Sequence, residues 1–279
     1  MDITIDNFIK TSLNEDIGSG DITSLACIDQ NTSGSAKLIA KESCKIAGIN
    51  IAKKIYNTYD AHLFFSPLVD EGELLKSGDV IFTIKGKKHS ILATERLVLN
   101  CMQRMSGIAT KTNNFVNQIQ DLNTIILDTR KTCPSIRFLD KEAVRIGGGN
   151  NHRNGLYDVI MIKDNHIDFS GSIQQAITNC HNYLKKNNIQ KYIIIEARNI
   201  TEVHEIINHG KINRILLDNF TIEDTKKAVK LVDNKYPIES SGNININNIR
   251  NYALCGVNFI SIGCLTHSVK STDLSMLCI

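Results

Sequence analysis

After about residue 120, short apolar runs alternate with helical patterns, and this alternation is what most constrains the fold. Most of the runs are continuously apolar, which is typical of parallel strands buried on both faces. Repeated strand–helix units of this kind favour a TIM-like α/β barrel over an open doubly wound sheet. The runs expected to form strands are residues 124–128, 158–163, 192–196, 214–218, 236–240 and 257–262.

The helical segments between these runs carry end signals. One helix is expected to begin at Thr201 and to stop at Gly210. A second begins at Thr221, where Asp224 three residues later makes a variant of the capping box, and a third ends at Gly256. No GxGxxG motif follows the first predicted strand, which argues against a dinucleotide-binding fold.

The first part of the chain has a different pattern. Residues 36–40, 62–69 and 80–86 are β-like runs, and residues 48–59 have apolar side chains at helical spacing. These segments predict an α+β module. A long helical pattern follows from roughly residue 91 to residue 119, with a broad apolar stripe that is interrupted at Ser106–Gly107.

Composition excludes several classes of protein. The 279 residues carry a net charge of +3, which is too small and too localised for a nucleic-acid binder. The eight cysteines form no CxxC pair and are expected to be free thiols in a reducing compartment. The first 21 residues are acidic without an apolar region, so no secretory signal is expected, and no apolar run is long enough to span a membrane. These features predict a cytoplasmic protein.

The positive charge is concentrated between Thr129 and Lys163. This stretch contains seven Lys or Arg residues and three acidic residues, so it is net +4 and the rest of the chain is about neutral. The run of glycines at 147–149 lies within it. Basic side chains beside glycine-rich turns suit a small polyanion such as phosphate, pyrophosphate or a dicarboxylate, although a solvated basic helix face has the same composition.

Polar or small residues stand at the end of every predicted strand in the second part of the chain. In a barrel these ends meet at one mouth, where the active site lies. The residues are Asp128 with Arg130 and Lys131 directly after it, Lys163, Glu196, Asp218, Ser241 with Gly242, and Gly263.

These residue types divide into chemical roles. The last two strand ends offer backbone N–H groups in small-residue turns, which commonly hold a phosphate. Glu196 and Asp218 could accept hydrogen bonds from sugar hydroxyls or hold a magnesium ion, in part through water. The basic residues, including His152 and Arg153, are donors for anionic groups. The set therefore indicates a sugar phosphate with a second anionic group as ligand.

At these residues the sequence closely resembles the quinolinate phosphoribosyltransferases. The motifs TRKT, GGGxxHR, KDNH and SG occur in that order, which is a highly specific combination. The resembling segments cover nearly the whole chain and are residues 15–23, 93–110, 128–156, 162–166, 216–219, 239–244 and 260–268.

The resemblance implies an incomplete TIM-like α/β barrel at residues 116–267. It also implies an N-terminal α/β sandwich-like domain at residues 1–115, joined by the C-terminal tail 268–279. The implied reaction joins quinolinate to phosphoribosyl pyrophosphate with Mg²⁺, giving nicotinate mononucleotide, pyrophosphate and CO₂ in NAD biosynthesis. The implied assembly is a homodimer with shared active sites, either alone or within a hexamer.

The resemblance also implies roles for individual residues. Arg96, Arg130, His152 and Arg153 would hold the quinolinate carboxylates, and Ser241, Gly242 and Gly263 would cradle the 5′-phosphate. Lys131 and Lys163 would face phosphoribosyl pyrophosphate, while Glu196 and Asp218 would hold the ribose hydroxyls and the magnesium region. The last four are the residues expected to act in catalysis.

Three positions depart from the family pattern. Ile194 replaces the first acidic residue of an EVE strand, Asn243 replaces the last glycine of SGG, and Asn258 replaces the aspartate of GVD. Asn243 matters most, because it adds a side chain to a loop expected to approach phosphate. Two other functions stay open at this point: a phosphoribosyltransferase for nicotinate or another ring acid, and a non-catalytic oxyanion-binding homologue. Four cationic partners favour a dicarboxylate, and the presence of both Glu196 and Asp218 favours catalysis.

Overall fold

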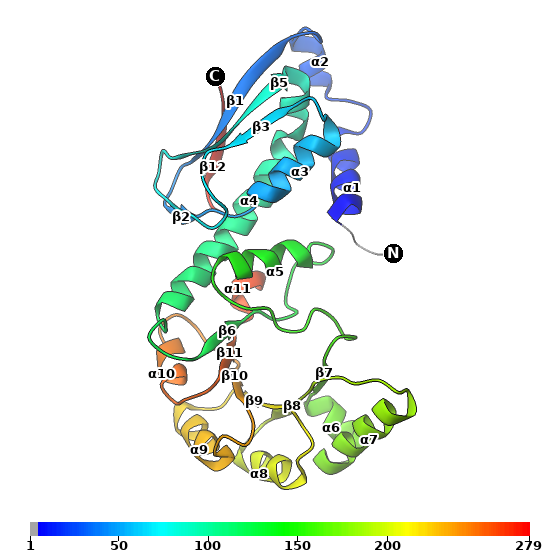
Figure 1. The fold of residues 1–279 in the computed structure, drawn as a ribbon, viewed down its shortest axis with the longest axis vertical. Coiled ribbons are helices and arrows are strands. Elements are labelled where there is room, and N and C mark those ends of the chain that lie inside the picture. Colours follow the sequence, from blue (N-terminus) through cyan, green and yellow to red (C-terminus); the bar gives the residue numbers. More distant parts are fainter. Residues whose placement is uncertain (1–4) are drawn as a thin grey trace. The chain divides into compact units, whose positions relative to one another are not determined.

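The computed structural model describes residues 5–279 and divides them into two compact units (Figure 1). Residues 1–4 lie outside the described residues. They begin the 21-residue segment in which no secretory signal is expected. The first unit contains the chain up to Asn113, residues 132–148 and residues 265–279. The second contains residues 114–131 and 149–264. The predicted domain division stays a prediction. It assigns residues 132–148 to the barrel, whereas here they belong to the first unit.

The first unit is built on a four-stranded antiparallel sheet in the order β12-β1-β5-β3. Along β1, Ala36, Leu38 and Ala40 are buried at alternate positions, so one face of the sheet is apolar. Helix α3 lies against the sheet (Figure 1), and Tyr56 from this helix packs against Phe82 with ring centroids 6.0 Å apart. The strands are β1 (Ser33–Ala40), β3 (Phe64–Pro67), β5 (Val80–Lys87) and β12 (Leu274–Cys278), with a separate pair β2 (Cys44–Lys45) and β4 (Leu74–Leu75).

The helices of this unit are α1 (Ile5–Ile17), α2 (Ile22–Cys27), α3 (Ile49–Tyr59), α4 (Lys88–Asn117), α5 (Arg137–Ile146) and α11 (Cys264–His267), with the ends of α4 and α11 crossing into the second unit. The long helical pattern is confirmed as α4, which runs without a break through Ser106 and Gly107. Both residues have packing roles. The hydroxyl of Ser106 bonds to the backbone of Ala47, and a side chain at Gly107 would collide with the backbone of Lys270.

The second unit contains a six-stranded parallel sheet in the order β6-β11-β10-β9-β8-β7. Strands β7 to β11 follow one another, and β6 returns to pair with β11, which is the order of a barrel. The predicted class is therefore confirmed as an α/β fold with a parallel sheet and a separate antiparallel unit, but β6 and β7 are not paired and the barrel stays open. The strands are β6 (Ile125–Leu127), β7 (Ile160–Ile162), β8 (Ile193–Ala197), β9 (Arg214–Asp218), β10 (Ile238–Ser241) and β11 (Phe259–Ser261).

The opening beside β6 is partly occupied by the segment after the glycine run. Asn150 makes an isolated parallel bridge with Leu127, and its N–H donates to the carbonyl of Ile126 at 2.8 Å. The carbonyl of Asn150 in turn accepts from the N–H of Asp128 at 3.1 Å. Residues 149–153 therefore run alongside β6 and are positioned at the carboxyl end of the sheet.

The helices of the second unit lie along the outside of the sheet (Figure 1) and are α6 (Asp164–Ser170), α7 (Ile173–Lys186), α8 (Ile200–His209), α9 (Ile222–Val232) and α10 (Ile249–Ala253). The predicted cap at Thr221 is confirmed, since its hydroxyl accepts from the N–H of Asp224. The predicted start at Thr201 was wrong: Asn199 caps α8 by accepting from Glu202 N–H. Helix α10 ends at Ala253, three residues before Gly256.

Candidate active site

All but one of the predicted site residues lie in the second unit, either at or just after strand ends or in the segment beside β6. Because the six strands are parallel, their carboxyl ends share one edge of the sheet. Arg96 is the exception: it is an exposed residue of α4 in the first unit. The residues of the second unit are Arg130, Lys131, His152, Arg153, Lys163, Glu196, Asp218, Ser241, Gly242 and Gly263.

Lys163 and Glu196 form an ion pair at the ends of the neighbouring strands β7 and β8. The Nζ of Lys163 lies 3.0 Å from Oε2 of Glu196, with the lysine half-exposed and the carboxylate buried. Burial raises the pKa of Glu196, Lys163 opposes that rise, and the negative charges of Asp218 and Asp164 add to it. Glu196 and Asp218 are thus carboxylates whose charges repel, which is the environment that a cation relieves.

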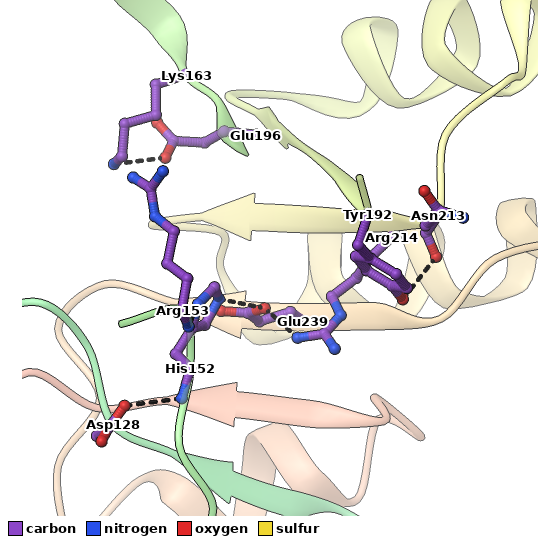
Figure 2. Close-up of polar contacts among 9 residues, drawn as sticks. All are labelled: Asp128, His152, Arg153, Lys163, Tyr192, Glu196, Asn213, Arg214 and Glu239. Carbon is purple, nitrogen blue, oxygen red and sulfur yellow. Dashed lines mark hydrogen bonds and ion pairs between the residues drawn. The ribbon is translucent and has the colours of Figure 1, made fainter. Parts of the chain in front are cut away.

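Arg153 lies in a region of unbalanced positive charge. Burial lowers the pKa of its guanidinium, and the positive charge of Arg130 lowers it further, while Asp158 acts in the opposite direction. In Figure 2 the Arg153 side chain extends toward the Lys163–Glu196 pair. Two guanidinium groups that destabilise each other's charge are a favourable environment for a small anion.

The loop after β10 has a backbone geometry that favours glycine at position 242. Gly242 has φ of +93°, and a Cβ there would lie 2.9 Å from the backbone nitrogen of Asn219 and closer still to its side chain. The family departure Asn243 has φ of +51°, a left-handed conformation that asparagine adopts more readily than most residues. Its side chain donates to Oδ1 of Asn219 at 3.0 Å, so the added side chain turns toward the neighbouring loop.

His152 is connected to a buried network that the sequence analysis did not identify (Figure 2). Its Nε2 lies 3.2 Å from Oε2 of Glu239, and its backbone N–H donates to Asp128 at 2.8 Å. Glu239 also pairs with Arg214 at 2.9 Å. One signal in the sequence could have located this network: Glu239 stands inside a strand of otherwise buried residues, where a carboxylate requires a partner.

The described part of the chain gives further results on metals, thiols and membranes. Within residues 5–279, no group of three or more His, Cys, Asp or Glu side chains has the arrangement of a metal site. The eight cysteines, which all fall in this range, are free thiols as predicted. None of the described helices is both long enough and apolar enough to cross a membrane.

Comparison with known proteins gives the family. Residues 21–106 match the N-terminal domain of quinolinate phosphoribosyl transferase, and residues 108–277 match its C-terminal domain. The chain is 39% identical over 283 residues to quinolinate phosphoribosyltransferase (decarboxylating) 1b of Nicotiana tabacum, covering 96% of this chain and 80% of that protein. It is 40% identical over 262 residues to a probable nicotinate-nucleotide pyrophosphorylase (carboxylating) of Bacillus subtilis (strain 168), covering 94% and 89%.

Solved structures agree with the sequence matches. The nicotinate-nucleotide pyrophosphorylase from Francisella tularensis superimposes with a TM-score of 0.93 and 38% identity, covering 100% of this chain and 96% of that one. The fold and these matches define a phosphoribosyltransferase-type enzyme of NAD biosynthesis. The chain belongs to the quinolinate phosphoribosyl transferase family.

Proposed function

We propose that this enzyme transfers the phosphoribosyl group of phosphoribosyl pyrophosphate to the ring nitrogen of quinolinate. The C1–N bond forms and the C1–O bond to pyrophosphate breaks, so its electron pair leaves with pyrophosphate. The ring nitrogen becomes cationic, and this charge stabilises the electron pair that the breaking C–carboxylate bond leaves on the adjacent ring carbon as CO₂ departs. The ring carbon then takes a proton from solvent. The observation that carries the proposal is the Arg130–Arg153 charge pair at the strand ends of a chain from this family.

The quinolinate subsite is proposed at Arg130 and Arg153, with His152 directly beside Arg153 and Arg96 as a further contact. Two carboxylates carry two negative charges, which two mutually repelling guanidinium groups can neutralise. A mono-acid such as nicotinate would leave one of these charges without a partner. This charge count favours quinolinate over the nicotinate alternative.

The phosphoribosyl pyrophosphate subsite is proposed at Lys131, Lys163, and the loops of Ser241–Gly242 and Gly263. Gly242 supports this assignment because its left-handed conformation belongs to the small-residue turns whose backbone N–H groups commonly bind phosphate. Lys163 would face the pyrophosphate, and its Nζ is held in position by Oε2 of Glu196 at 3.0 Å. Fixed positive charge then stabilises the leaving pyrophosphate as the C1–O bond breaks.

Glu196 and Asp218 are the residues proposed to hold Mg²⁺ and the ribose hydroxyls. Two carboxylates are too few for a closed metal cage, but Mg²⁺ in phosphate chemistry keeps several waters and binds substrate oxygens. The donor set fits the ion, since Asp218 and Asp164 both raise the pKa of Glu196 and a cation would offset that repulsion. Bound Mg²⁺ supplies positive charge to the pyrophosphate oxygens.

The assembly is proposed to be a homodimer, alone or within a hexamer, in which each subunit completes its partner's site. Arg96 supports this, because it is exposed and makes no hydrogen bond or ion pair with any other residue of the 5–279 range. A planar guanidinium of this kind suits two-point contact with a carboxylate. The cytoplasmic location stays part of the proposal, as does the absence of a nucleic-acid partner.

The direct test is incubation of the purified chain with quinolinate, phosphoribosyl pyrophosphate and Mg²⁺, followed by mass analysis for nicotinate mononucleotide and CO₂. Nicotinate replaces quinolinate in a parallel reaction. Product from quinolinate only is expected. Product from nicotinate only would assign the mono-acid reaction, and no product from either would leave a non-catalytic oxyanion-binding homologue.

Two variants separate the subsites. Arg153→Ala should weaken the binding of quinolinate roughly ten- to a hundredfold more than the binding of phosphoribosyl pyrophosphate, because a charge-assisted hydrogen bond to quinolinate is lost. Asp218→Asn should lower turnover and change the Mg²⁺ requirement with the fold intact. Equal effects of Arg153→Ala on both substrates would reject the quinolinate assignment.

A further inference from the structure

Glu239 is a fully buried carboxylate in the middle of strand β10. It has no solvent exposure, and the parallel register places Leu216 of β9 and Phe259 of β11 beside it. Burying an ionised carboxylate among apolar groups is costly unless opposite charge and hydrogen bonds compensate for lost water. A carboxylate here is therefore held by specific partners, and those partners show what it does.

Arg214, the first residue of β9, provides the compensating charge. Its Nη1 lies 2.9 Å from Oε2 of Glu239. Its guanidinium stands over the Phe259 ring at 3.8 Å from the centroid and 5.5 Å from that of Tyr192. Stacking and the ion pair hold the guanidinium beside Glu239 (Figure 2). Burial alone would raise the pKa of Glu239, but the ion pair with Arg214 at 2.9 Å opposes that rise, so the carboxylate is ionised.

The contacts of His152 determine its tautomer. Its Nδ1 lies 2.7 Å from the backbone nitrogen of Arg153, and a backbone N–H can only donate, so Nδ1 is an unprotonated acceptor. Its Nε2 faces the ionised Glu239, which can only accept, so Nε2 carries the proton. His152 is therefore a neutral imidazole with both ring nitrogens engaged inside the protein, and its side chain is 6% exposed.

The backbone on both sides of the ring is anchored. Asp128, itself fully buried, accepts from the N–H of His152 at 2.8 Å. The N–H of Arg153 is directed at the His152 ring, and Nη1 of Arg153 reaches the carbonyl of Val159 at 3.4 Å. Asp128 and the orientation of the His152 imidazole thus fix the backbone of Arg153, and with it the base of the Arg153 side chain.

We propose that Glu239 and Arg214 are positioning residues for the anion subsite, holding His152 as the Nε2–H tautomer so that its Nδ1 fixes the backbone of Arg153. The quinolinate carboxylate is then bound by Arg153, and His152 acts through Arg153 rather than by donating to the substrate. This inference rests on the proposed function for the identity of the ligand. The state of the His152 ring can be measured without turnover.

The first experiment is nitrogen NMR of the full chain labelled with ¹⁵N-histidine, with the His152 signals assigned by comparison with His152→Gln. One unprotonated nitrogen (Nδ1) and one protonated nitrogen (Nε2) are expected, and the same pattern is expected with quinolinate bound. Protonation of Nδ1, in the free chain or on addition of quinolinate, would overturn the inference, because Nδ1 could then not accept from the N–H of Arg153.

The second experiment measures binding of quinolinate and of phosphoribosyl pyrophosphate by calorimetry in Arg214→Met. Without Arg214, Glu239 takes up a proton and offers its O–H to Nε2, so that Nδ1 becomes protonated and repels the N–H of Arg153. The affinity for quinolinate should fall about tenfold, which is the effect of one lost hydrogen bond, and the affinity for phosphoribosyl pyrophosphate should stay unchanged. The matched control is Arg250→Met, which removes an exposed arginine paired with Asp121 in the same unit and should change neither ligand.

A pair of double variants keeps the test decisive if Arg214→Met does not fold. Arg214→Met with Glu239→Gln removes both charges but keeps an acceptor for Nε2–H, whereas Arg214→Met with Glu239→Leu keeps none. The affinity of the Gln form for quinolinate should be within about threefold of wild type, a difference smaller than the loss of one hydrogen bond would cause. The affinity of the Leu form should be about tenfold lower than that of wild type. Equal affinities of the two would overturn the inference. Absence of nicotinate mononucleotide in the assay would overturn the proposed function instead, because the NMR result does not depend on it.

Discussion

Asn243 donates a side-chain hydrogen bond of 3.0 Å to Oδ1 of Asn219, which ties together the loops that follow β10 and β9. Both residues have left-handed backbone conformations, with φ of +51° and +55°. The backbone N–H of Asn219 also donates to the carbonyl of Ser241 at 2.9 Å. The glycine that the family has at position 243 is thus replaced by the residue type that best tolerates its conformation and that adds a bond to the adjacent loop.

Asn243→Gly should therefore be well tolerated, and Asn243→Val should not. Glycine keeps the left-handed conformation and loses one exposed hydrogen bond, at a cost of about 1 kcal/mol or less. Valine loses the same bond and adds about 1–2 kcal/mol of backbone strain. Urea unfolding and the KM for phosphoribosyl pyrophosphate measure the two effects. Equal behaviour of the two variants would show that the conformation at 243 does not matter.

Gly242→Ala should impair the proposed phosphate loop specifically. The new Cβ would fall 2.9 Å from the backbone nitrogen of Asn219, so one of the two loops must move, at a cost of about 1–3 kcal/mol. The KM for phosphoribosyl pyrophosphate should rise by roughly tenfold or more. Gly171→Ala is the matched control, since Gly171 has φ of +89° but no atoms within 4 Å of a Cβ. An equal rise in both variants would indicate a general loss of stability.

The sequence predicted the parallel strands well, because each is a short apolar run whose burial follows from its own residues. Residues 193–195, for example, are three isoleucines and lie buried in β8. The role of Gly107 in α4 could not be predicted in this way. Glycine is a poor helix former, but a side chain at this position would collide with the backbone of Lys270, which is distant in sequence.

The candidate site shows the same difference. Lys163, Glu196 and Asp218 were found because each stands at the carboxyl end of the strand that positions it. The network behind His152 was missed because its members come from β6, β9, β10 and the segment after the glycine run. Only the register of the folded sheet brings Arg214 and Glu239 together, and no local pattern around Arg214 indicates that it is paired.

Asp140→Asn should destabilise the first unit. Asp140 is fully buried and binds Arg104 at two points, with Nε at 2.7 Å and Nη2 at 2.8 Å, and it also accepts from the N–H of Cys133 at 3.0 Å. Removing its charge leaves Arg104 without its partner, at a cost of about 3 kcal/mol. Urea unfolding measures this loss. Asp121→Asn serves as control, because the Asp121–Arg250 pair has similar geometry but is exposed, and it should have little effect.

Glu239 should contribute to the pH dependence of stability. Its pKa in the folded chain lies below the ordinary value of 4.5, so between these two values the unfolded chain binds more protons. The stabilisation is therefore fully present above about pH 4.5 and is lost as the pH falls through the folded pKa. Glu239→Gln should be less stable at pH 7 and should lose less stability on acidification. The control Glu223→Gln, at an exposed position of α9, should retain the wild-type acid dependence; a wild-type acid dependence in Glu239→Gln would contradict the prediction.

Complementation between inactive variants tests the shared site. Arg96→Ala and Lys131→Ala should each be nearly inactive, because Arg96 lies in the first unit and Lys131 in the second, and the proposed site takes one from each subunit. After mixing and subunit exchange, half of the dimers contain both variants, and each mixed dimer has one intact site of two. Activity should therefore recover to about a quarter of wild type.

The control mixture of Arg153→Ala with Lys131→Ala should recover nothing, because both residues belong to the second unit and every site then lacks one of them. Mass spectrometry of isotopically labelled subunits confirms the exchange. Failure to recover activity despite that exchange would place Arg96 in the site of its own subunit or outside the chemistry.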